Sequence, residues 1–241
     1  MAKIHVILQG KGGVGKSFVA ATLAQYKTKS EQKLLCIDTD PVNATFSGYT
    51  AINVERLQIM DGDEINTRNF DILIEMIASS KNDVIIDNGA SSFVQMSHYL
   101  ISNHVPSLLA EMGHELVVHT VITGGQALLD TINGFAQLVR QFPDNALFVV
   151  WLNPYWGPVE DNGKHFEQMK TYIENKDRVS AIIHVPALKE ETYGRDVTEM
   201  LQERLTFDEA LSSSSRSIMT RQRLKIVREQ LFKQLDNAVV L

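Results

Sequence analysis

The sequence is short of cysteine, because Cys36 is the only one in 241 residues. A single cysteine excludes an internal disulfide framework. It also excludes an electron carrier that holds a bridging iron–sulfur cluster through several thiolates. Cys36 lies in the apolar run at 34–37, where a small buried side chain fits the pattern better than a reactive thiol.

Long apolar runs and an excess of positive charge are absent as well. No uninterrupted stretch approaches the roughly 18 residues of a membrane span. The chain starts on a strand-like segment at 4–8, without the charged and apolar regions of a signal peptide. We therefore expect a cytoplasmic protein with no transmembrane segment. With 23 basic and 29 acidic residues the formal net charge is -6, so any nucleic-acid contact requires a local patch.

The pattern of apolar residues indicates the fold class. Hydrophobic residues make up 44% of the chain and charged residues 22%, as is usual for a soluble protein with a real core. Short runs rich in Val and Ile alternate with segments of helical periodicity. Because these runs are apolar throughout, both faces of each strand are expected to be buried. The pattern predicts an α/β fold, a doubly wound and mainly parallel sheet with helices on both faces.

The expected elements follow one another without repeats or a long linker, so a single domain over 1–241 is expected. The serine run at 212–215 is typical of a surface loop or a helix start. The predicted strands lie at 4–8, 34–37, 84–86, 116–121, 147–152 and 179–185. The predicted helices lie at 16–29, 69–79, 94–101, 125–142, 166–175 and 197–204, followed by a C-terminal helix within 216–241.

A glycine-rich loop stands between the first predicted strand and the first predicted helix. Its residues match the phosphate-binding pattern G-x-x-x-x-G-K-[ST] in the required context. Glycines let backbone amides turn toward phosphate oxygens, and the following helix adds its positive dipole end. A structural turn alone would not need four glycines followed by Lys-Ser. The loop consists of Gly10, Lys11, Gly12, Gly13, Val14, Gly15, Lys16 and Ser17.

Two residues of this loop have specific chemistry, and a third makes the pattern narrower. Lys16 would place its charge on the β- and γ-phosphates, and the Ser17 hydroxyl could bind Mg²⁺. With Lys11 included, the loop resembles the deviant Walker A loop of the ParA/MinD ATPases, which have a P-loop NTPase fold. That resemblance implies a homodimer on ATP binding, in which Lys11 reaches the nucleotide of the other subunit. A solvated loop lysine is the plainer alternative.

Carboxylates follow two of the predicted strands. Asp38 and Asp40 end the second one, at the edge of the sheet where α/β proteins bind ligands. The resemblance implies that Asp38 orients the Mg²⁺ shell through water and that Asp40 positions the attacking water. A simple turn at 38–41 is the alternative. Asp87 ends an apolar strand as in a Walker B motif, so we expect it to hold Mg²⁺ directly or through water.

The base-binding residues are expected further along the chain. Asn153 ends a strand at a position where the family reads adenine, and Pro186 resembles the segment that closes over the base. No aspartate follows Asn153 at the spacing that guanine readers use. ATP/ADP is therefore favoured over GTP as the cofactor, together with Mg²⁺.

The loop also departs from the family pattern, and it resembles a narrower group. Phe18 stands where the family usually has a hydroxyl that binds the α-phosphate, so one hydrogen bond of about 1 kcal/mol is missing. Val42 and Asn43 replace the usual Gln-Gly. The stretches 38–46 and 190–196 resemble the TraL proteins encoded by conjugative plasmids. This implies a role in conjugal DNA transfer and a protein partner in the conjugation machinery.

Two other features of the sequence are the C-terminal helix and the histidines at 114 and 119. The C-terminal helix has an apolar stripe, and its basic residues lie largely off that stripe. A helix packed on the domain is the main interpretation, and contact of its basic face with DNA, or with a membrane surface or partner helix, stays open. His114 and His119 are expected to be structural or surface residues. The stripe is Leu224, Val227, Leu231 and Leu235.

The sequence thus predicts a Mg²⁺-dependent ATP-binding protein, an ATPase that switches between nucleotide states as a dimer. A catalytic role is expected for Lys11, Lys16 and Asp40. Two alternatives remain. A small-molecule kinase of the same fold would not need Lys11, and a nucleotide-binding scaffold would hold ATP without turnover.

Overall fold

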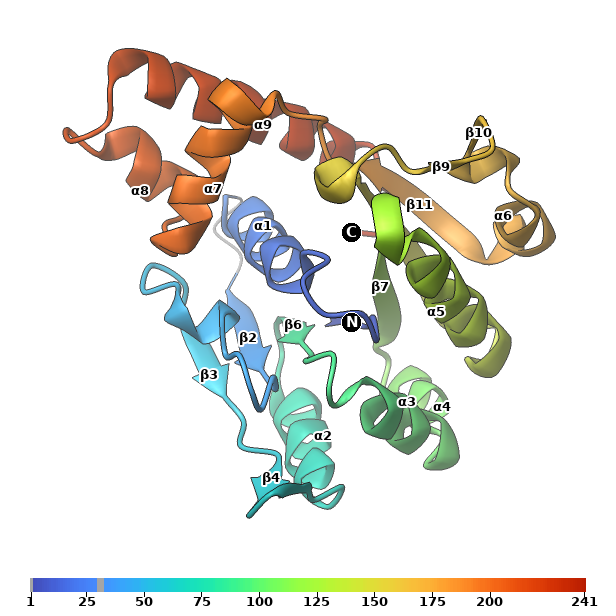
Figure 1. The fold of residues 1–241 in the computed structure, drawn as a ribbon. Coiled ribbons are helices and arrows are strands. Elements are labelled where there is room, and N and C mark those ends of the chain that lie inside the picture. The colour runs from blue at the N-terminus through green and yellow to red at the C-terminus, as the bar shows by residue number, and fades with distance from the viewer. Residues whose placement is uncertain (1, 30–32) are drawn as a thin grey trace.

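The computed structural model describes residues 2–29 and 33–241. Its centre is a sheet of seven parallel strands in the order β11-β8-β7-β1-β6-β2-β3 (Figure 1). Two short antiparallel hairpins, β4 with β5 and β9 with β10, lie outside it. The strands of the central sheet are β1 Lys3–Ile7, β2 Leu34–Asp38, β3 Val54–Arg56, β6 Asp83–Asp87, β7 Glu115–Thr123, β8 Leu147–Asn153 and β11 Val179–His184. The hairpin strands are β4 Met60–Asp61, β5 Glu64–Ile65, β9 Glu160–Asp161 and β10 Lys164–His165.

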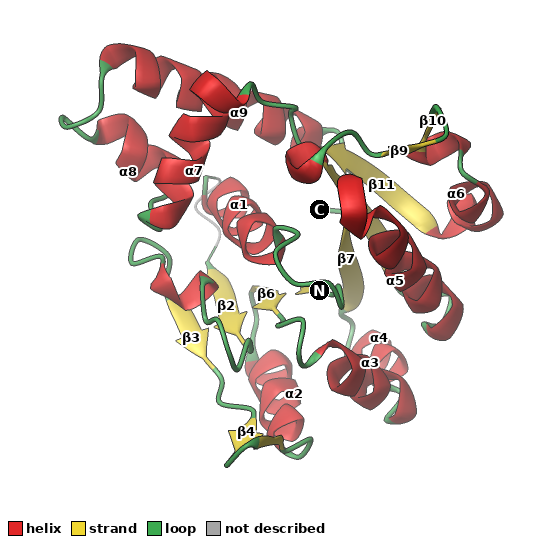
Figure 2. Cartoon of the chain, viewed as in Figure 1, coloured by secondary structure: helices red, strands yellow, loops and turns green. Residues whose placement is uncertain are grey.

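Helices cover both faces of the sheet (Figure 2). One face packs against α2, α3, α4 and α5, and the other packs against α1, α7, α8 and α9. The α-helices are α1 Lys16–Thr28, α2 Asn69–Ser79, α3 Phe93–Ser102, α4 Val105–Glu111, α5 Leu128–Gln141, α6 Lys170–Asn175, α7 Arg195–Gln202, α8 Phe207–Ser212 and α9 Ile218–Asp236. Short 3-10 turns are η1 Phe46–Gly48, η2 Gly125–Ala127, η3 Pro154–Trp156, η4 Phe166–Gln168 and η5 Lys176–Arg178, and η6 Glu190–Gly194 is a π-helix.

Successive side chains of the central strands enter different cores. In β7, Val118 lies in the core under α5, whereas its neighbour Val117 lies in the core under α1. Both are fully buried, which is why the strand reads as a continuous apolar run. The predicted doubly wound, parallel α/β fold is confirmed.

Short elements were missed in the sequence. Strand β3 is an edge strand of three residues, two of them exposed, and so it leaves no apolar run. Helix α8 begins with a capping box in which Thr206 and Glu209 exchange hydrogen bonds. That Thr-x-x-Glu spacing was a usable signal. Cys36 is buried as predicted, and burial raises the pKa of its thiol to about 12.

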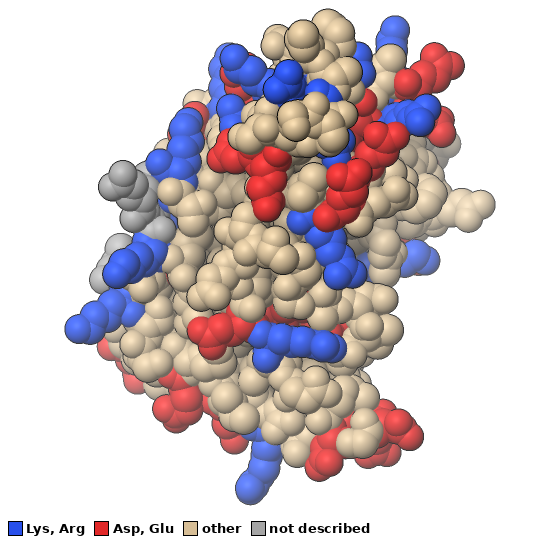
Figure 3. All heavy atoms as spheres, turned by 90° about the vertical axis from the view of Figure 1, so that its left-hand side faces the viewer, with Lys and Arg blue, Asp and Glu red and all other residues tan. Residues whose placement is uncertain are grey.

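Helix α9 lies within the predicted 216–241 segment, and its predicted apolar stripe is buried in the same core as α1. Its basic side chains are partly neutralised. Arg223 forms an ion pair with Asp196 of α7, and Arg228 forms one with Asp208 of α8. Figure 3 shows Lys and Arg interspersed with Asp and Glu on the face that it presents. Over residues 2–29 and 33–241, no helix is both long enough and apolar enough to cross a membrane.

Candidate functional site

The glycine-rich loop connects β1 to α1 at the carboxyl edge of the sheet. Gly13 and Gly15 have φ values of 72° and 103°, in the left-handed region that favours glycine. A side chain at Gly15 would also collide with Asn153, whose Nδ2 lies 2.9 Å from the ideal Cβ position. The loop conformation therefore requires glycine, and it leaves the backbone facing an open space.

Lys16 is held at the mouth of this loop. Its side chain is largely buried, and its Nζ donates a hydrogen bond to the Lys11 carbonyl oxygen at 3.1 Å. Burial lowers the pKa of Lys16, while the nearby charges of Asp87 and Asp40 oppose the shift. A partly desolvated cation fixed in this position is suited to bind an anion such as phosphate.

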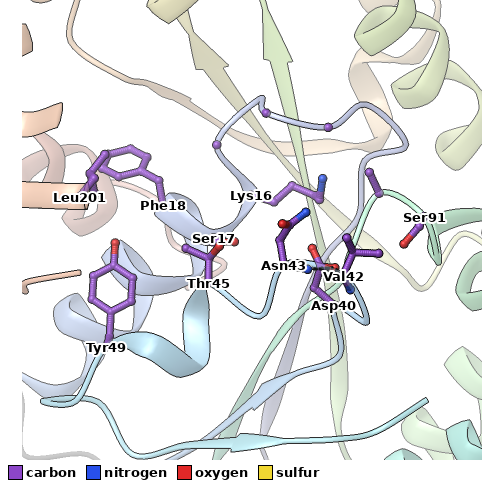
Figure 4. Close-up of a pocket in the computed structure, with 14 residues that line it drawn as sticks. Lys16, Ser17, Phe18, Asp40, Val42, Asn43, Thr45, Tyr49, Ser91 and Leu201 are labelled. Carbon is purple, nitrogen blue, oxygen red and sulfur yellow. Dashed lines mark hydrogen bonds between the residues drawn. The ribbon is translucent and has the colours of Figure 1, made fainter. Parts of the chain in front are cut away.

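A cavity of about 550 Å³ opens in front of the loop. Figure 4 shows Lys16, Asp40 and Asn43 at one end and Phe18, Tyr49 and Leu201 at the other. Seven of the predicted site residues contribute to the lining. The full lining is Gly12, Gly13, Gly15, Lys16, Ser17, Phe18, Asp40, Val42, Asn43, Thr45, Tyr49, Ala90, Ser91 and Leu201.

Asp38 and Asp40 lie where β2 ends. Asp38 is fully buried and accepts hydrogen bonds from the amides of Asp40 at 3.0 Å and Ser47 at 2.8 Å. Burial raises its pKa, and these hydrogen bonds oppose the rise. Asp40 accepts the amides of Val42 and Asn43 through Oδ1, both at 2.9 Å. Asp40 therefore closes a turn and lines the cavity at the same time. A turn at 38–41 and a place for Asp40 in the ligand site are thus compatible.

Asp87 ends β6 directly beside Asp38, its partner in the strand register. It is buried, and neither carboxylate oxygen accepts a hydrogen bond from the part of the chain that the structure describes. Burial is the main cause that raises the pKa of Asp87 to about 7. The nearby Ser17 hydroxyl and Lys16 lower it, and Asp38 raises it further. A buried carboxylate without a hydrogen-bond donor is costly unless a cation completes its surroundings.

The segments after β2 and β6 are joined to each other. The Thr39 hydroxyl donates to the Asp87 carbonyl oxygen at 3.1 Å and lies 3.2 Å from Asn88 Oδ1. Gly89 leaves room for Asp40, because an ideal Cβ at Gly89 would lie 2.7 Å from Asp40 Oδ1. Sequence reasoning missed Thr39, although a hydroxyl between two aspartates was a usable signal.

Asn153 supports the phosphate loop from behind. Its Nδ2 donates to the Val14 carbonyl oxygen at 2.9 Å, and its Oδ1 accepts the Tyr155 amide at 3.2 Å. Neither Asn153 nor Pro186 lines the cavity. Their roles in binding the base stay predictions.

The other loop residues lie outside the cavity lining. Lys11 Nζ forms an ion pair with Asp130 Oδ2 in α5. Val14 is buried in the core under α1, and Gly10 packs against the Phe93 ring. The proposed contact of Lys11 with a second subunit stays a prediction.

The residues present fit a nucleotide with its magnesium ion. The described ranges contain no group of three or more His, Cys, Asp or Glu side chains placed to hold a metal by themselves. A Mg²⁺ that shares its shell with water and phosphate does not need such a group. The Ser17 hydroxyl and the unpartnered Asp87 carboxylate are the available protein ligands.

A parallel sheet with a strand–loop–helix phosphate site and an aspartate on the neighbouring strand defines a P-loop nucleotide-binding protein. The family model "CobQ/CobB/MinD/ParA nucleotide binding domain" matches residues 5–213, and the chain belongs to this family. It is 75% identical to "Protein TraL" from Escherichia coli, over 100% of both chains. A second Escherichia coli protein of that name is 73% identical, also over both full lengths. The resemblances stated from the sequence are therefore confirmed.

Solved structures agree on the fold. A protein described as a plasmid partition protein from Borrelia burgdorferi B31, bound to AMPPNP, matches with a TM-score of 0.53 and 15% identity, covering 99% of this chain and 100% of that one. The cell division protein MinD from Aquifex aeolicus matches with a TM-score of 0.53 and 14% identity, covering 96% of this chain and 97% of that one.

Proposed function

We propose that this chain is a Mg²⁺-dependent ATPase of the ParA/MinD type that acts as a single NTPase domain. One observation carries the proposal. The buried Lys16 cation lines one end of the cavity beside the glycine-rich loop. Its charge interacts with the buried Asp87 carboxylate, which accepts no hydrogen bond from the residues that the structure describes. Phosphate would bind the lysine and the amides, and a divalent cation would bind the carboxylate.

The residues divide the work in this proposal. Lys16 and the amides of the loop bind and orient the β- and γ-phosphates, and Ser17 and Asp87 hold the magnesium ion, with Asp38 acting through water. The ion supplies neutralisation of charge on the transferred phosphate. Asp40 accepts the two turn amides through Oδ1, and no donor among the described residues is bound to Oδ2, which would orient the attacking water.

The exposed apolar side chains around the loop support a homodimer. Val42, Val94, Leu129 and Trp156 are each more than half exposed. They follow β2, β6, β7 and β8 respectively, so all four lie at the carboxyl edge of the sheet. Exposed apolar groups that gather at one edge are typical of an interaction surface. A second copy placed there would bring its Lys11 to the nucleotide.

ATP binding would act as a switch in this dimer. The segments after β2 and β6 contact each other through Thr39 and through Asp40 against Gly89. A γ-phosphate that orders one segment therefore orders the other, and hydrolysis releases both. The likeness to the TraL proteins supports a role in plasmid conjugation with a protein partner. Contact of the basic side of α9 with DNA remains part of the proposal.

The test compares wild type with Lys16→Ala by calorimetry and by phosphate release, in the presence of Mg²⁺. Wild type should bind ATP and release phosphate, and the variant should lose binding because the charge on the β- and γ-phosphates is gone. Unchanged ATP affinity in the variant would reject the phosphate site. Tight binding by wild type without release, with or without DNA and cell extract, would favour the scaffold.

A further inference from the structure

Gln9 is a buried glutamine directly before the glycine-rich loop, outside the lining of the cavity. The pairing of β1 with β7 ends next to it, where the Leu8 amide donates to the His119 carbonyl oxygen at 2.8 Å. Two residues further along β7, Gln9 Nε2 donates to the Val121 carbonyl oxygen at 3.0 Å. The side chain thus continues the hydrogen bonding between these strands at the point where the backbone turns into the loop.

The same amide group reaches helix α5. Gln9 Nε2 also donates to the Thr131 carbonyl oxygen at 3.2 Å. Gly134 in the interior of α5 leaves room for this contact, because an ideal Cβ there would lie 2.5 Å from Gln9 Oε1. Glycine makes a helix interior less stable than alanine does. The space that Gln9 occupies therefore explains why α5 has a glycine at this position.

The oxygen of the Gln9 amide faces Lys11. Gln9 Oε1 accepts a hydrogen bond from the Lys11 amide at 3.4 Å. The Lys11 carbonyl oxygen accepts from Lys16 Nζ at 3.1 Å, and Lys11 Nζ pairs with Asp130 at 2.8 Å. Lys11 is thus held at its amide, its carbonyl and its ammonium group. Because Asp130 and Thr131 are neighbours in α5, the contacts of the amide and of the ammonium group both lead to the same turn of that helix.

We propose that Gln9 is a positioning residue that fixes Lys11 relative to α5 and so sets where the Lys11 ammonium group meets the nucleotide of a second copy. This inference rests on the proposed function, in which Lys11 acts across a dimer. Leu129, one of the exposed apolar residues proposed for the dimer surface, directly precedes Asp130 in α5. Contact of a second copy with this turn would therefore be transmitted to Lys11 through Gln9 and Asp130.

A structural role alone is the alternative, and it makes a different prediction. A glutamine that only satisfies the carbonyl groups of β7 and α5 would stabilise the fold whether or not Lys11 is present. A positioning residue has its effect on hydrolysis only through the group that it positions. The two roles therefore differ in whether substitutions of Gln9 and Lys11 act independently.

A double-mutant cycle on the full chain with ATP and Mg²⁺ tests the inference. Gln9→Met keeps the length of the side chain and removes its hydrogen bonds. It should bind a non-hydrolysable ATP analogue within about 3-fold of wild type, since Lys16 and Ser17 are unchanged. Its hydrolysis should fall about 10- to 100-fold, because a small displacement of a positioned group costs that much. In the Lys11→Ala background the same substitution should change hydrolysis by less than about 2-fold.

The slow residual turnover of Lys11→Ala is followed with γ-labelled ATP at an excess of protein. Gly134→Ala is the second variant, and it leaves Gln9 in the sequence. Its methyl group would displace Gln9, so hydrolysis should fall although alanine favours a helix, and this loss too should vanish in the Lys11→Ala background. Gln25→Ala is the matched control. Gln25 Oε1 accepts the Phe207 amide at 2.7 Å near the far end of α1, and this variant should hydrolyse ATP as wild type does.

Losses from Gln9→Met and Lys11→Ala that multiply in the double variant overturn the inference, because Gln9 would then act independently of Lys11. If Gln9→Met does not fold, the cycle of Gly134→Ala with Lys11→Ala decides by the same criterion. Hydrolysis at the wild-type rate in Gln9→Met and Gly134→Ala also overturns the inference and leaves the proposed function intact. A wild type that neither dimerises with the analogue nor hydrolyses ATP rejects the proposed function itself.

Discussion

Lys11 Nζ lies 2.8 Å from Asp130 Oδ2, and both side chains are about half exposed, at 45% and 59%. The lysine proposed to act on a second subunit is thus bound to a carboxylate of its own chain. Surface ion pairs contribute at most about 1 kcal/mol, so this contact can be exchanged for a stronger one. A phosphate group bound by the other subunit would be such a partner.

Lys11→Ala should bind ATP in its own loop but fail to dimerise with it. The binding groups of that loop, Lys16, Ser17 and the backbone amides, are unchanged. Hydrolysis should fall on the order of 10³-fold, because a cation supplied to the transferred phosphate by a partner is worth that much. Sedimentation with a non-hydrolysable analogue measures the dimer. A variant that dimerises as well as wild type would show that Lys11 is only a loop lysine.

Asp130→Asn should make the dimer somewhat tighter. The change keeps the size of the side chain but releases Lys11 from its ion pair, and the gain should stay below about tenfold in the dimer dissociation constant. Asp144→Asn is the control, since Asp144 is also exposed and also pairs with a basic residue, Arg178. Weaker dimerisation of Asp130→Asn would mean that Asp130 belongs to the interface itself.

Asp40→Asn should leave ATP binding intact and stop hydrolysis. Asparagine retains an oxygen that can accept the amides of Val42 and Asn43, so the turn survives while the negative charge is lost. Asp40→Ala removes the acceptor oxygen as well as the charge. Comparing the two variants therefore separates the effect of losing the turn from the effect of losing the charge. Phosphate release measured at saturating ATP is the readout. Turnover of Asp40→Asn at the wild-type rate would assign the water to another group.

Stability should fall in mild acid because of a buried pair of histidines. Trp151 Nε1 donates a hydrogen bond to His119 Nδ1 at 3.0 Å, so the proton of the neutral His119 ring lies on Nε2. His119 Nε2 in turn donates a hydrogen bond to His5 Nδ1, also at 3.0 Å. Burial lowers the pKa of His119 to about 3, and burial together with His119 and Lys27 lowers that of His5. Unfolded histidine has a pKa of about 6.5, so below this pH the unfolded chain binds more protons.

The free energy of unfolding should therefore drop as pH falls through about 6.5, by about 2 kcal/mol from His119 alone at pH 5. Urea unfolding at pH 7 and pH 5 measures the difference. His119→Gln should reduce this dependence, because glutamine does not titrate yet can still accept from Trp151. The exposed His98→Gln is the control. An equal pH dependence in wild type and His119→Gln would contradict the argument.

The site residues that the sequence identified share one property. Each belongs to a short local motif whose position in the fold follows from the elements on either side of it. Lys16 and Ser17 belong to a contiguous motif, and Asp38, Asp40 and Asp87 follow strands that end at the same edge of a parallel sheet. Adjacent strands bring such residues together without further information.

Tyr49 and Leu201 could not be found in this way. They meet at the cavity because α7 packs beside α1 and η1, and this contact joins segments about 150 residues apart. Nothing in the sequence around either residue marks it as part of a site. His119 was expected to be structural or a surface residue, and its burial shows the former. The burial arises because β1, β7 and β8 align His5, His119 and Trp151 on one face.

Helix α9 begins at Ile218 and lies wholly beyond the residue at which the family match stops. The match ends at residue 213, yet Leu224, Leu231 and Leu235 lie in the same core as Val19 and Leu23 of α1. A recombinant fragment trimmed to the shared family region would uncover the helix whose first residues are Lys16 and Ser17. We expect such a fragment to aggregate or to bind phosphate less tightly, so the end of the family match is a poor guide to where this protein can be truncated.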